Sequence, residues 1–180
     1  MPFDPASGLY LAAPDPHLEQ REKRLAELGL LHPAPALAEG LDAFAARLAQ
    51  ESGFPYAMVN FITGHQRFAG LHAPYGREGL PPVGRQMSLT DGYCPALLTR
   101  RAPLVLPNVL AAPRFAGNPV VDQIGIHAYA GAQLVDGRSG MTLGTVCVVD
   151  VAKRPRESAD TMLTMIKDAR DRLSRHLPLA

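Results

Sequence analysis

Tryptophan is absent from this 180-residue sequence, and aromatic residues make up only 6% of it. Proteins that bind single-stranded nucleic acid stack its bases on aromatic side chains, so such platforms are poorly supplied here. An excess of one charge is missing too: 18 Lys and Arg stand against 17 Asp and Glu, which gives a formal net charge of +1. Binding nucleic acid through its phosphates needs clustered positive charge. We therefore expect no nucleic-acid partner.

Cysteine is scarce, with Cys94 and Cys147 alone, too few for the disulfide framework of a small secreted domain. No segment approaches the ~18 apolar residues that a membrane-spanning helix requires. The first residues also lack the basic start and the apolar stretch of a secretory signal. The sequence predicts a cytoplasmic protein with no membrane partner. Both thiols are expected to be reduced and to act first as small buried apolar groups.

Apolar residues and turn formers are what the sequence does contain. Hydrophobic residues make up 47% and charged residues 19%, which is typical of a folded chain. The length suits one domain with a real core. Residues 1–15 are rich in Pro, Ala and Gly without any period, so they are expected to form a disordered or extended arm. Residues 16–180 are assigned to a single domain.

Hydrophobic periodicity predicts helices near both ends of this domain. The three predicted helices cover residues 16–31, 37–50 and 158–176. Between them, β-branched and aromatic content predicts strands. These cover residues 56–63, 66–72, 104–106, 127–135 and 141–149. The last two strands flank a five-residue link with glycine, which is typical of an antiparallel hairpin. The predicted fold class is α+β with an antiparallel sheet.

The connections in the middle of the chain are unusually rich in Gly and Pro. Residues 73–87 form a long loop, and loops of that length inside a compact domain are often functional. A short helix is expected to begin at Ser88 or Asp91 and to run to about Arg101. Arg77 and Arg85 on the loop can clamp an anion, although a solvated loop arginine is the commoner state.

Five segments in register, spread over nearly the whole chain, resemble motifs of the GAF domain family. They are the hairpin YAMVNFITGHQRF (residues 56–68), Arg85 and Ser88 followed by DGYC (91–94), PRFAGNPVV (113–121), AYAGA (128–132) and LGTVCVVD (143–150). The resemblance implies a central antiparallel sheet of five to six strands. N- and C-terminal helices would pack on one face and often form a dimer. Loops and short helices would roof a small-molecule pocket on the other face.

Strand alternation suggests which residues face that pocket. Ala128, Ala130, Ala132 and Leu134 form a small apolar face suited to helix packing, which leaves Tyr129 and Gln133 toward the loops. Hydrogen bonds that tie down the loops are an equally good role for these two residues. Thr145 and Cys147 are the favoured pocket residues on the partner strand, although the register is open. The ligand-binding candidates are Tyr93, Cys94, Phe115, His127, Tyr129, Gln133, Thr145 and Cys147.

Two of these candidates carry possible chemistry. Cys94 lies near the start of the expected short helix, whose N-terminus can lower the pKa of the thiol. Free methionine sulfoxide reductases with the GAF fold use thiols near this position and a further cysteine in the following loop, where this sequence has none. That difference argues against a reductase unless Cys147 reaches Cys94. His127 precedes the Tyr-Ala-Gly run and is a candidate pocket histidine or haem ligand, although a structural role is favoured.

Signatures of known cofactors are missing. His65, His72 and His127 match no zinc spacing. Neither cysteine precedes a histidine, as bilin attachment would require, and there is no cyclic-nucleotide or phosphate-loop motif. The cofactor is left unknown, and no metal site and no catalytic residue are assigned.

Three functions are compatible with these features. The leading hypothesis is a regulatory module that binds a small molecule, moves the 73–87 loop and acts through an effector protein, since no effector domain is recognised in the sequence. The second is an interaction module that homodimerises through its terminal helices and has no ligand. The third is a thiol oxidoreductase that uses Cys94 and Cys147.

Overall fold

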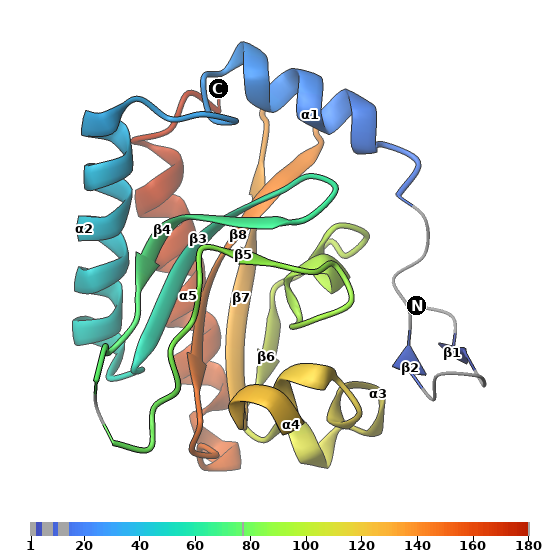
Figure 1. The fold of residues 1–180 in the computed structure, drawn as a ribbon, viewed down its shortest axis with the longest axis vertical. Helices are drawn as coiled ribbons and strands as arrows, with labels where there is room; N and C mark the ends of the chain where they lie inside the picture. Colours follow the sequence, from blue (N-terminus) through green and yellow to red (C-terminus); the bar gives the residue numbers. More distant parts are fainter. Residues whose placement is uncertain (1–2, 5–8, 11–14, 77, 180) are drawn as a thin grey trace.

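The computed structural model describes residues 3–4, 9–10, 15–76 and 78–179. Its centre is a six-stranded antiparallel sheet in the order β5-β4-β3-β8-β7-β6 (Figure 1). The strands are β3 (Tyr56–Ile62), β4 (Gln66–His72), β5 (Gln86–Met87), β6 (Leu104–Leu106), β7 (Ala128–Val135) and β8 (Thr142–Asp150). The predicted α+β fold with five to six strands is confirmed.

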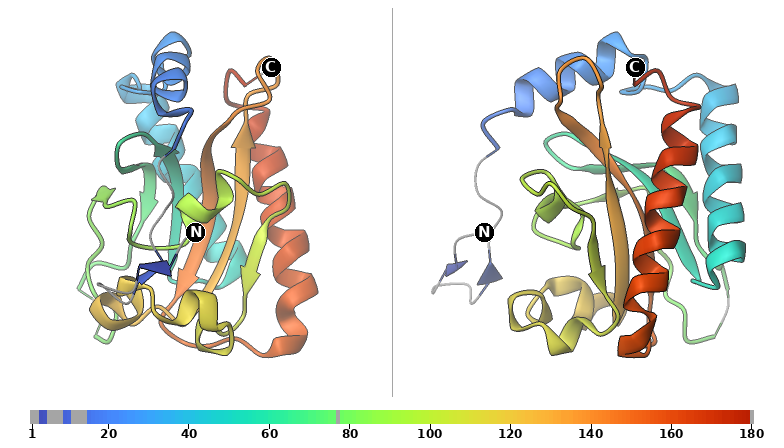
Figure 2. Two further views of the ribbon diagram at one scale, coloured as in Figure 1. Left: turned by 90° about the vertical axis from the view of Figure 1, so that its right-hand side faces the viewer. Right: turned by 180° about the vertical axis from the view of Figure 1, so that it is seen from behind.

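Two helices cover one face of this sheet. They are α2 (Pro35–Ser52) and α5 (Ala159–Ser174), which lie side by side (Figure 2). Each buries one apolar stripe against the sheet, as the helical spacing predicts. The helix α2 ends at Gly53, whose φ of 67° is the left-handed conformation that glycine adopts readily.

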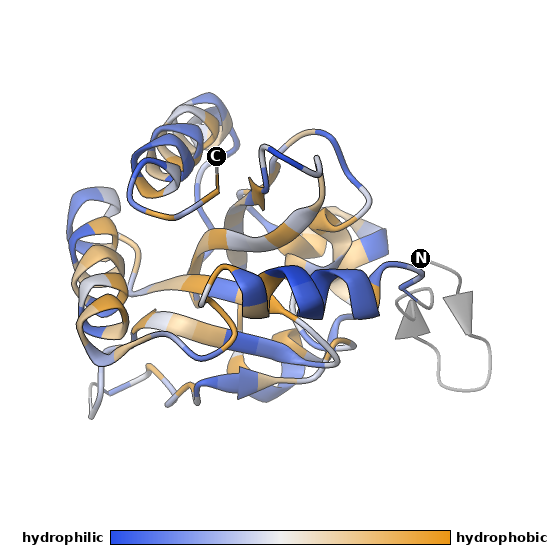
Figure 3. Cartoon of the chain, turned by 90° about the horizontal axis from the view of Figure 1, so that it is seen from above, coloured by the Kyte–Doolittle hydropathy of each residue, from blue (hydrophilic) through white to orange (hydrophobic). Residues whose placement is uncertain are grey.

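The first helix, α1 (Leu18–Glu27), buries Leu25 in the same core as α2 and α5, as expected of a terminal helix, but its position differs from theirs. It lies across the end of the sheet and is mostly hydrophilic (Figure 3). Arg21 donates from Nε to the carbonyl of Thr142 at 2.7 Å, and Arg24 pairs with Asp136 at 3.0 Å. These bonds hold α1 to the turn between β7 and β8, because its charged residues need acceptors that the apolar face does not offer.

The sheet separates two hydrophobic cores. The helix-side core lies between the sheet and α2 and α5, and the roof-side core lies on the opposite face. Ala128, Ala130, Ala132 and Leu134 belong to the helix-side core, while Tyr129 belongs to the roof-side core. The predicted alternation of β7 is therefore confirmed.

Leu143 is an exception on β8. The alternation predicts that it shares a face with Cys147, but it lies in the helix-side core. Leu134 of β7 pairs with Gly144 of β8, and the next residue, Val135, pairs with Thr142. Leu143 is therefore an extra residue on β8, where the register shifts. This irregularity turns Leu143 to the other face.

The roof consists of residues 78–98 and 109–126, which cross the second face of the sheet. It contains β5, three very short helices and the turns between them (Figure 1). The helices are η1 (Cys94–Leu97), α3 (Pro113–Ala116) and α4 (Pro119–Ile124), and the turn η2 (Val109–Ala111) precedes α3. The short helix expected up to Arg101 is wrong in length, because only the four residues of η1 are helical.

Most of the expected arm over residues 1–15 lies outside the described residues, as does Arg77. Of the arm, the structure describes Asp15 and the short antiparallel pair β1 (Phe3–Asp4) and β2 (Leu9–Tyr10). A last helical turn, η3 (Arg156–Ser158), leads into α5. In the described part of the chain, no helix combines the length and the apolar character needed to cross a membrane.

Candidate functional site

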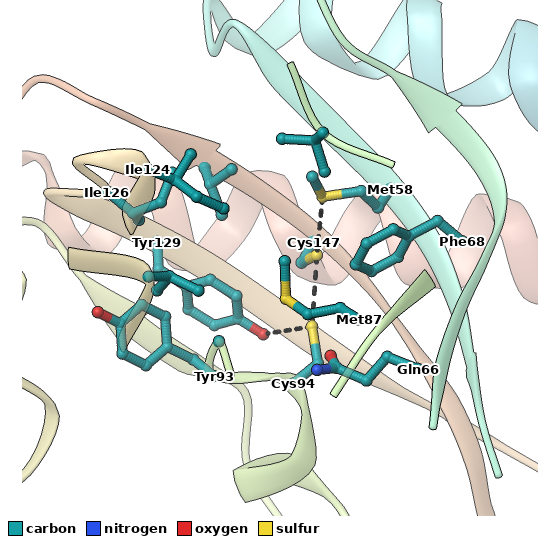
Figure 4. A pocket seen from close by; sticks show the side chains of 14 residues that line it. Met58, Gln66, Phe68, Met87, Tyr93, Cys94, Ile124, Ile126, Tyr129 and Cys147 are labelled. Carbon is teal, nitrogen blue, oxygen red and sulfur yellow. Dashed lines mark hydrogen bonds between the residues drawn. The ribbon is translucent and has the colours of Figure 1, made fainter. Parts of the chain in front are cut away.

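A partly enclosed cavity of about 40 Å³ lies between the sheet and the roof (Figure 4). Its walls are almost entirely apolar, and two cysteines and two methionines are among the lining residues. The lining residues are Met58, Gln66, Phe68, Val83, Met87, Gly92, Tyr93, Cys94, Val120, Ile124, Ile126, Tyr129, Cys147 and Val149.

Two tyrosines form one wall of the cavity. The Tyr93 ring packs edge-on against Tyr129, with ring centroids 5.2 Å apart, and against Phe115 at 5.7 Å. Tyr129 folds back over Gly131 on the same face of β7, where a Cβ atom would stand 2.1 Å from the Tyr129 hydroxyl. Glycine at 131 therefore leaves room for this ring. Burial raises the pKa of both tyrosines, so their hydroxyls stay protonated and can donate.

The two cysteines meet at the cavity. Cys94 comes from η1 and Cys147 from the middle of β8, and their Sγ atoms are 3.5 Å apart (Figure 4). The Tyr129 hydroxyl lies 3.3 Å from the Cys94 Sγ, and the Met58 Sδ lies 3.8 Å from the Cys147 Sγ. Both thiols are at least 96% buried, with exposed fractions of 4% and 1%. Cys147 therefore does reach Cys94, the condition left open by the sequence.

The surroundings of the pair treat the two thiols differently. A hydrogen bond from Cys147, helped by Thr145, Tyr129 and Asn60, lowers the pKa of Cys94 to about 7 against the opposing effect of burial. The same hydrogen bond, together with burial, raises the pKa of Cys147. The lowered pKa of Cys94 agrees with the prediction, but its cause does not. Side-chain donors lower it, because η1 is a single short turn rather than a helix with a substantial dipole.

A polar network ties the floor of the cavity to the roof. Asn60 donates from Nδ2 to Gln66 Oε1 at 3.1 Å. Gln66 in turn donates from Nε2 to the carbonyls of Ser88 and Asp91, both at 2.6 Å. Apart from its interaction with the Cys94 thiol, Thr145 Oγ1 is buried without a hydrogen-bond partner among the described residues. Thr145 is therefore available to donate to a thiolate at Cys94.

Of the eight residues predicted from the sequence, four line the cavity: Tyr93, Cys94, Tyr129 and Cys147. Phe115 stands behind Tyr93, and Thr145 is buried beside the cysteines on β8. These six residues are thus brought together by the fold.

Gln133 and His127 lie away from the cavity. Gln133 donates from Nε2 to the carbonyls of Arg100 and Ala102, at 3.0 and 3.1 Å, so it ties down the connection before β6. His127 is half-buried just before β7, where its backbone pairs with Asp150 and Val109. Gln133 and His127 were expected in the pocket wall, but neither is among the residues that line the cavity.

Arg85 is also placed differently from the expected anion clamp. It pairs with Asp42 of α2 at 2.7 Å, and Asp42 accepts from the Leu71 N–H at 2.8 Å as well. The guanidinium is thereby engaged with a carboxylate of the protein itself.

No pattern in the sequence marks several of the lining residues as part of a pocket, above all Met58, Gln66 and Met87. Met58 faces Cys147 directly in the β3–β8 register, and Met87 belongs to the short edge strand β5 inside the expected loop. Only the pairing register of the strands could have identified them, and no local pattern encodes it.

Within the described part of the chain, no group of three or more His, Cys, Asp and Glu side chains is arranged to hold a metal ion. His65 and His72 lie at the two ends of the β3–β4 hairpin, far apart in its register. A nitrogen- or oxygen-rich metal centre is therefore absent among these residues.

Comparisons with known proteins give the fold a family. The family model for the GAF domain matches residues 36–176. No curated protein matches the chain.

Many solved structures share the fold at low sequence identity. The free methionine-R-sulfoxide reductase from Neisseria meningitidis, in complex with its substrate, is 16% identical over 93% of this chain and 97% of its own, with a TM-score of 0.53. The GAF domain of an Acinetobacter phosphoenolpyruvate-protein phosphotransferase is 13% identical over 89% and 92%, with a TM-score of 0.56. The A. aeolicus nlh2 GAF domain in an inactive state is 18% identical over 88% and 96%, with a TM-score of 0.57.

Proposed function

Because the chain belongs to the GAF domain family, we propose that it is a regulatory module that binds a small molecule beneath its roof and acts through an effector protein. The observation that carries this proposal is the cavity of about 40 Å³ between sheet and roof. Sites for small ligands are typically concave and mostly apolar, with a few placed polar groups. The two thiols, the Tyr129 hydroxyl and Gln66 are those groups here.

The size of the cavity limits the ligand. An engineered cavity of ~150 Å³ binds benzene. By that scale, the cavity of about 40 Å³ holds a ligand of roughly one or two non-hydrogen atoms. Nucleotides, bilins and haem are too large for it in this conformation. The ligand class is therefore a very small uncharged molecule or an ion that binds sulfur.

A chain of hydrogen bonds connects the cavity to the helical face. Gln66 joins the sheet to the roof at Ser88 and Asp91, and Arg85 joins the same segment to Asp42 of α2. A ligand that prefers one arrangement of the roof changes the population of both contacts. We propose that the ligand-dependent change reaches other proteins through the outer faces of the helices, where a second copy of the chain and an effector protein would bind.

Ligand occupancy can be tested directly on the purified full chain. We expect native mass spectrometry to show a bound small species in the wild type and not in Ile124→Phe, which fills the cavity. Val121→Phe is the matched control, since Val121 lies on the same helix and packs against the roof-side core without lining the cavity.

Xenon provides a second measurement that does not depend on the natural ligand. Xenon should shift the NMR signals of the Met58 and Met87 methyl groups in the wild type and in Val121→Phe, but not in Ile124→Phe. A wild type with neither added mass nor a xenon shift contradicts the proposal. Light scattering at micromolar concentration tests whether the chain forms a homodimer. A monomeric mass at that concentration contradicts the proposed homodimer.

The 3.5 Å distance between the two sulfurs favours a second candidate, a thiol oxidoreductase that reduces methionine sulfoxide. The Cys94 thiolate would take the oxygen from the sulfoxide as a sulfenic acid and leave methionine. The Cys147 thiol would then displace water to form a disulfide, which an external dithiol reduces. The substrate exceeds the cavity, so the roof must open. Turnover by the wild type with dithiothreitol, and none by Cys94→Ser, supports this candidate. No turnover in either excludes it.

A further inference from the structure

Four sulfur atoms converge on the cavity. Both cysteines of the chain and two of its six methionines line it. The Cys147 Sγ is 3.5 Å from the Cys94 Sγ and 3.8 Å from the Met58 Sδ, and Met87 points toward the same group of sulfurs (Figure 4). The Met87 Sδ is also within 3.4 Å of the position that a Cβ at Gly92 would take, next to Cys94.

We propose that Cys94, Cys147, Met58 and Met87 form a site for one copper(I) ion. Thiolate and thioether ligands are soft and select copper(I) over the divalent cations that prefer nitrogen and oxygen. This inference rests on the proposed function, since it assigns a ligand to the same cavity. It differs from ordinary methionine packing because the Met58 thioether lies against the Cys147 thiol rather than against hydrocarbon alone.

The spacing of the sulfurs suits a single ion. Two sulfurs bound tetrahedrally at ~2.3 Å from a metal are roughly 3.8 Å apart. The two separations that involve Cys147, 3.5 Å to Cys94 and 3.8 Å to Met58, are already near that value. The Met58 and Cys94 sulfurs lie on opposite sides of Cys147 (Figure 4), so the flexible methionine side chains must turn toward a common centre when the ion binds. An ion is also among the few ligands that a cavity of about 40 Å³ accommodates.

The charges around the site favour a monovalent ion. One thiolate neutralises copper(I), so little net charge is brought into an apolar cavity. Tyr129 can donate to the Cys94 sulfur, and Thr145 has a buried hydroxyl that can donate as well. Among the described residues, no imidazole or carboxylate lines the cavity, so zinc(II) would lack the ligands it commonly adds to two cysteines.

The four ligands come from both layers of the molecule. Met58 and Cys147 lie on the central strands β3 and β8, whereas Cys94 belongs to the roof and Met87 to the edge strand β5. A bound ion therefore links the roof to the sheet. Met87 follows closely after Arg85, which pairs with Asp42 of α2, so the link extends to the helical face.

The test is a titration of the reduced full chain with copper(I) in competition with the chelator bathocuproine disulfonate, without oxygen. We expect one copper(I) per chain. Cys94→Ser and Cys147→Ser should weaken binding more than about 100-fold, because even the outer-shell partners of a metal are worth about 10–100-fold. Met58→Leu and Met87→Leu, which keep the size and apolar character, should each weaken it about 10-fold or more. Met165→Leu, in a half-buried methionine of α5 on the helix-side core, should bind like the wild type.

Three results would overturn the site. The first is a wild type that gives up all copper(I) to the chelator. The second is undiminished binding in the Met58→Leu/Met87→Leu double variant, which reduces the site to a dithiol. The third is zinc(II) retained as tightly as copper(I), which denies the thioethers a role. X-ray absorption of the copper complex should show sulfur neighbours alone.

Circular dichroism separates a lost ligand from a lost fold in each variant. A negative result in the copper titration does not by itself contradict the proposed function, because the native mass spectrometry and xenon measurements test ligand binding without copper.

Discussion

Single residues show how closely β3 and β8 approach each other. At Gly144, a Cβ atom would stand 2.0 Å from the carbonyl oxygen of Asn60, which belongs to the backbone and cannot rotate away. We expect Gly144→Ala to destabilise the protein by about 1–3 kcal/mol or more, because the strands must separate. Urea denaturation measures the free energy of unfolding.

Gly40 is the matched control for this substitution. It lies on the exposed side of α2, and no atom is within 4 Å of the position of its Cβ. Gly40→Ala should therefore stabilise the protein by about 0.5–1 kcal/mol, since alanine favours the helix. Equal effects of the two substitutions would show that space at Gly144 is not the cause.

Asp136 provides a pH dependence at the residue scale. Its side chain is fully buried, and hydrogen bonds from Arg24 and Ser139 lower its pKa from 3.8 to about 2. A carboxylate whose pKa is lower in the folded state stabilises the protein above its unfolded pKa, and this contribution disappears as the pH falls from about 4 to about 2. Above pH 5, Asp136→Asn should cost on the order of 2 kcal/mol, and the difference from the wild type should shrink below pH 4.

The control is Asp171→Asn on α5. Asp171 pairs with Arg170 on the surface, where its side chain is 55% exposed. An exposed ion pair is worth about 0–1 kcal/mol. At every pH between 2 and 7, the urea midpoint of this variant should be close to that of the wild type. If the difference in the free energy of unfolding between the wild type and Asp136→Asn does not depend on pH, the ionised Asp136 carboxylate is not the source of this stability.

At the scale of elements, Asn118 holds the roof together. It caps α4 by accepting from Val120 at 3.2 Å, and it bridges to Gly92 with two bonds of 2.8 Å. Asn108 caps η2 by accepting from Leu110 at 3.1 Å but makes no bridge to the Cys94 segment. Asn118→Ala should thus lower the free energy of opening the roof by about 1–2 kcal/mol more than Asn108→Ala does.

The alkylation rate of Cys94 under native conditions reports this difference. Cys94 is 4% exposed, so a thiol reagent reaches it only when the roof opens. Asn118→Ala should raise the rate roughly tenfold for each 1.4 kcal/mol lost from the free energy of opening. Asn108→Ala should leave the rate near that of the wild type. Equal rates in the two variants would argue that the bridge does not keep the roof closed.

Elements with strong local patterns were predictable, and others were not. The alternation of Ala128 to Leu134 and the helical spacing of α2 and α5 depend on neighbours in sequence, which explains why these elements were predicted. The strand β5 and the four-residue η1 are short and depend on pairing with Gln66 and on packing against Tyr129 and Cys147. Such tertiary contacts override weak local preference.

On the scale of the whole molecule, the two cores should differ in their local stability. Ile166 of α5 is fully buried in the helix-side core, and Ile166→Ala should cost about 2–5 kcal/mol in global unfolding. Native-state alkylation of Cys94 should rise much less than in Asn118→Ala, because the roof opens without unfolding the helical layer.

Val135→Ala is the control for this substitution, since Val135 is 43% exposed and should cost less than about 0.5 kcal/mol. Urea midpoints and alkylation rates measured on the same samples test the separation of the two layers. If Ile166→Ala raised alkylation as much as Asn118→Ala, roof and helices would form one cooperative unit.

The arrangement of layers also bears on function. The sheet, which the helices back on its other face, and the short elements of the roof enclose the cavity from opposite sides. The contact between Arg85 and Asp42 joins the roof to the helices. A ligand that holds the roof can thus influence the helices without rearranging the sheet.

From the sequence alone follow the α+β class, five of the six strands of the sheet, the main helices, the GAF family motifs and the presence of Tyr93, Cys94, Tyr129 and Cys147 near one pocket. These depend on spacing within single segments and on motifs in chain order. The tertiary structure decided that Cys94 and Cys147 touch, that Met58 and Met87 join them, and that Gln133 and His127 stand aside. The scarcity of cysteine excluded a disulfide framework. The contact between the two cysteines at 3.5 Å depends on strand register and roof packing, because the two residues are 53 positions apart in the chain.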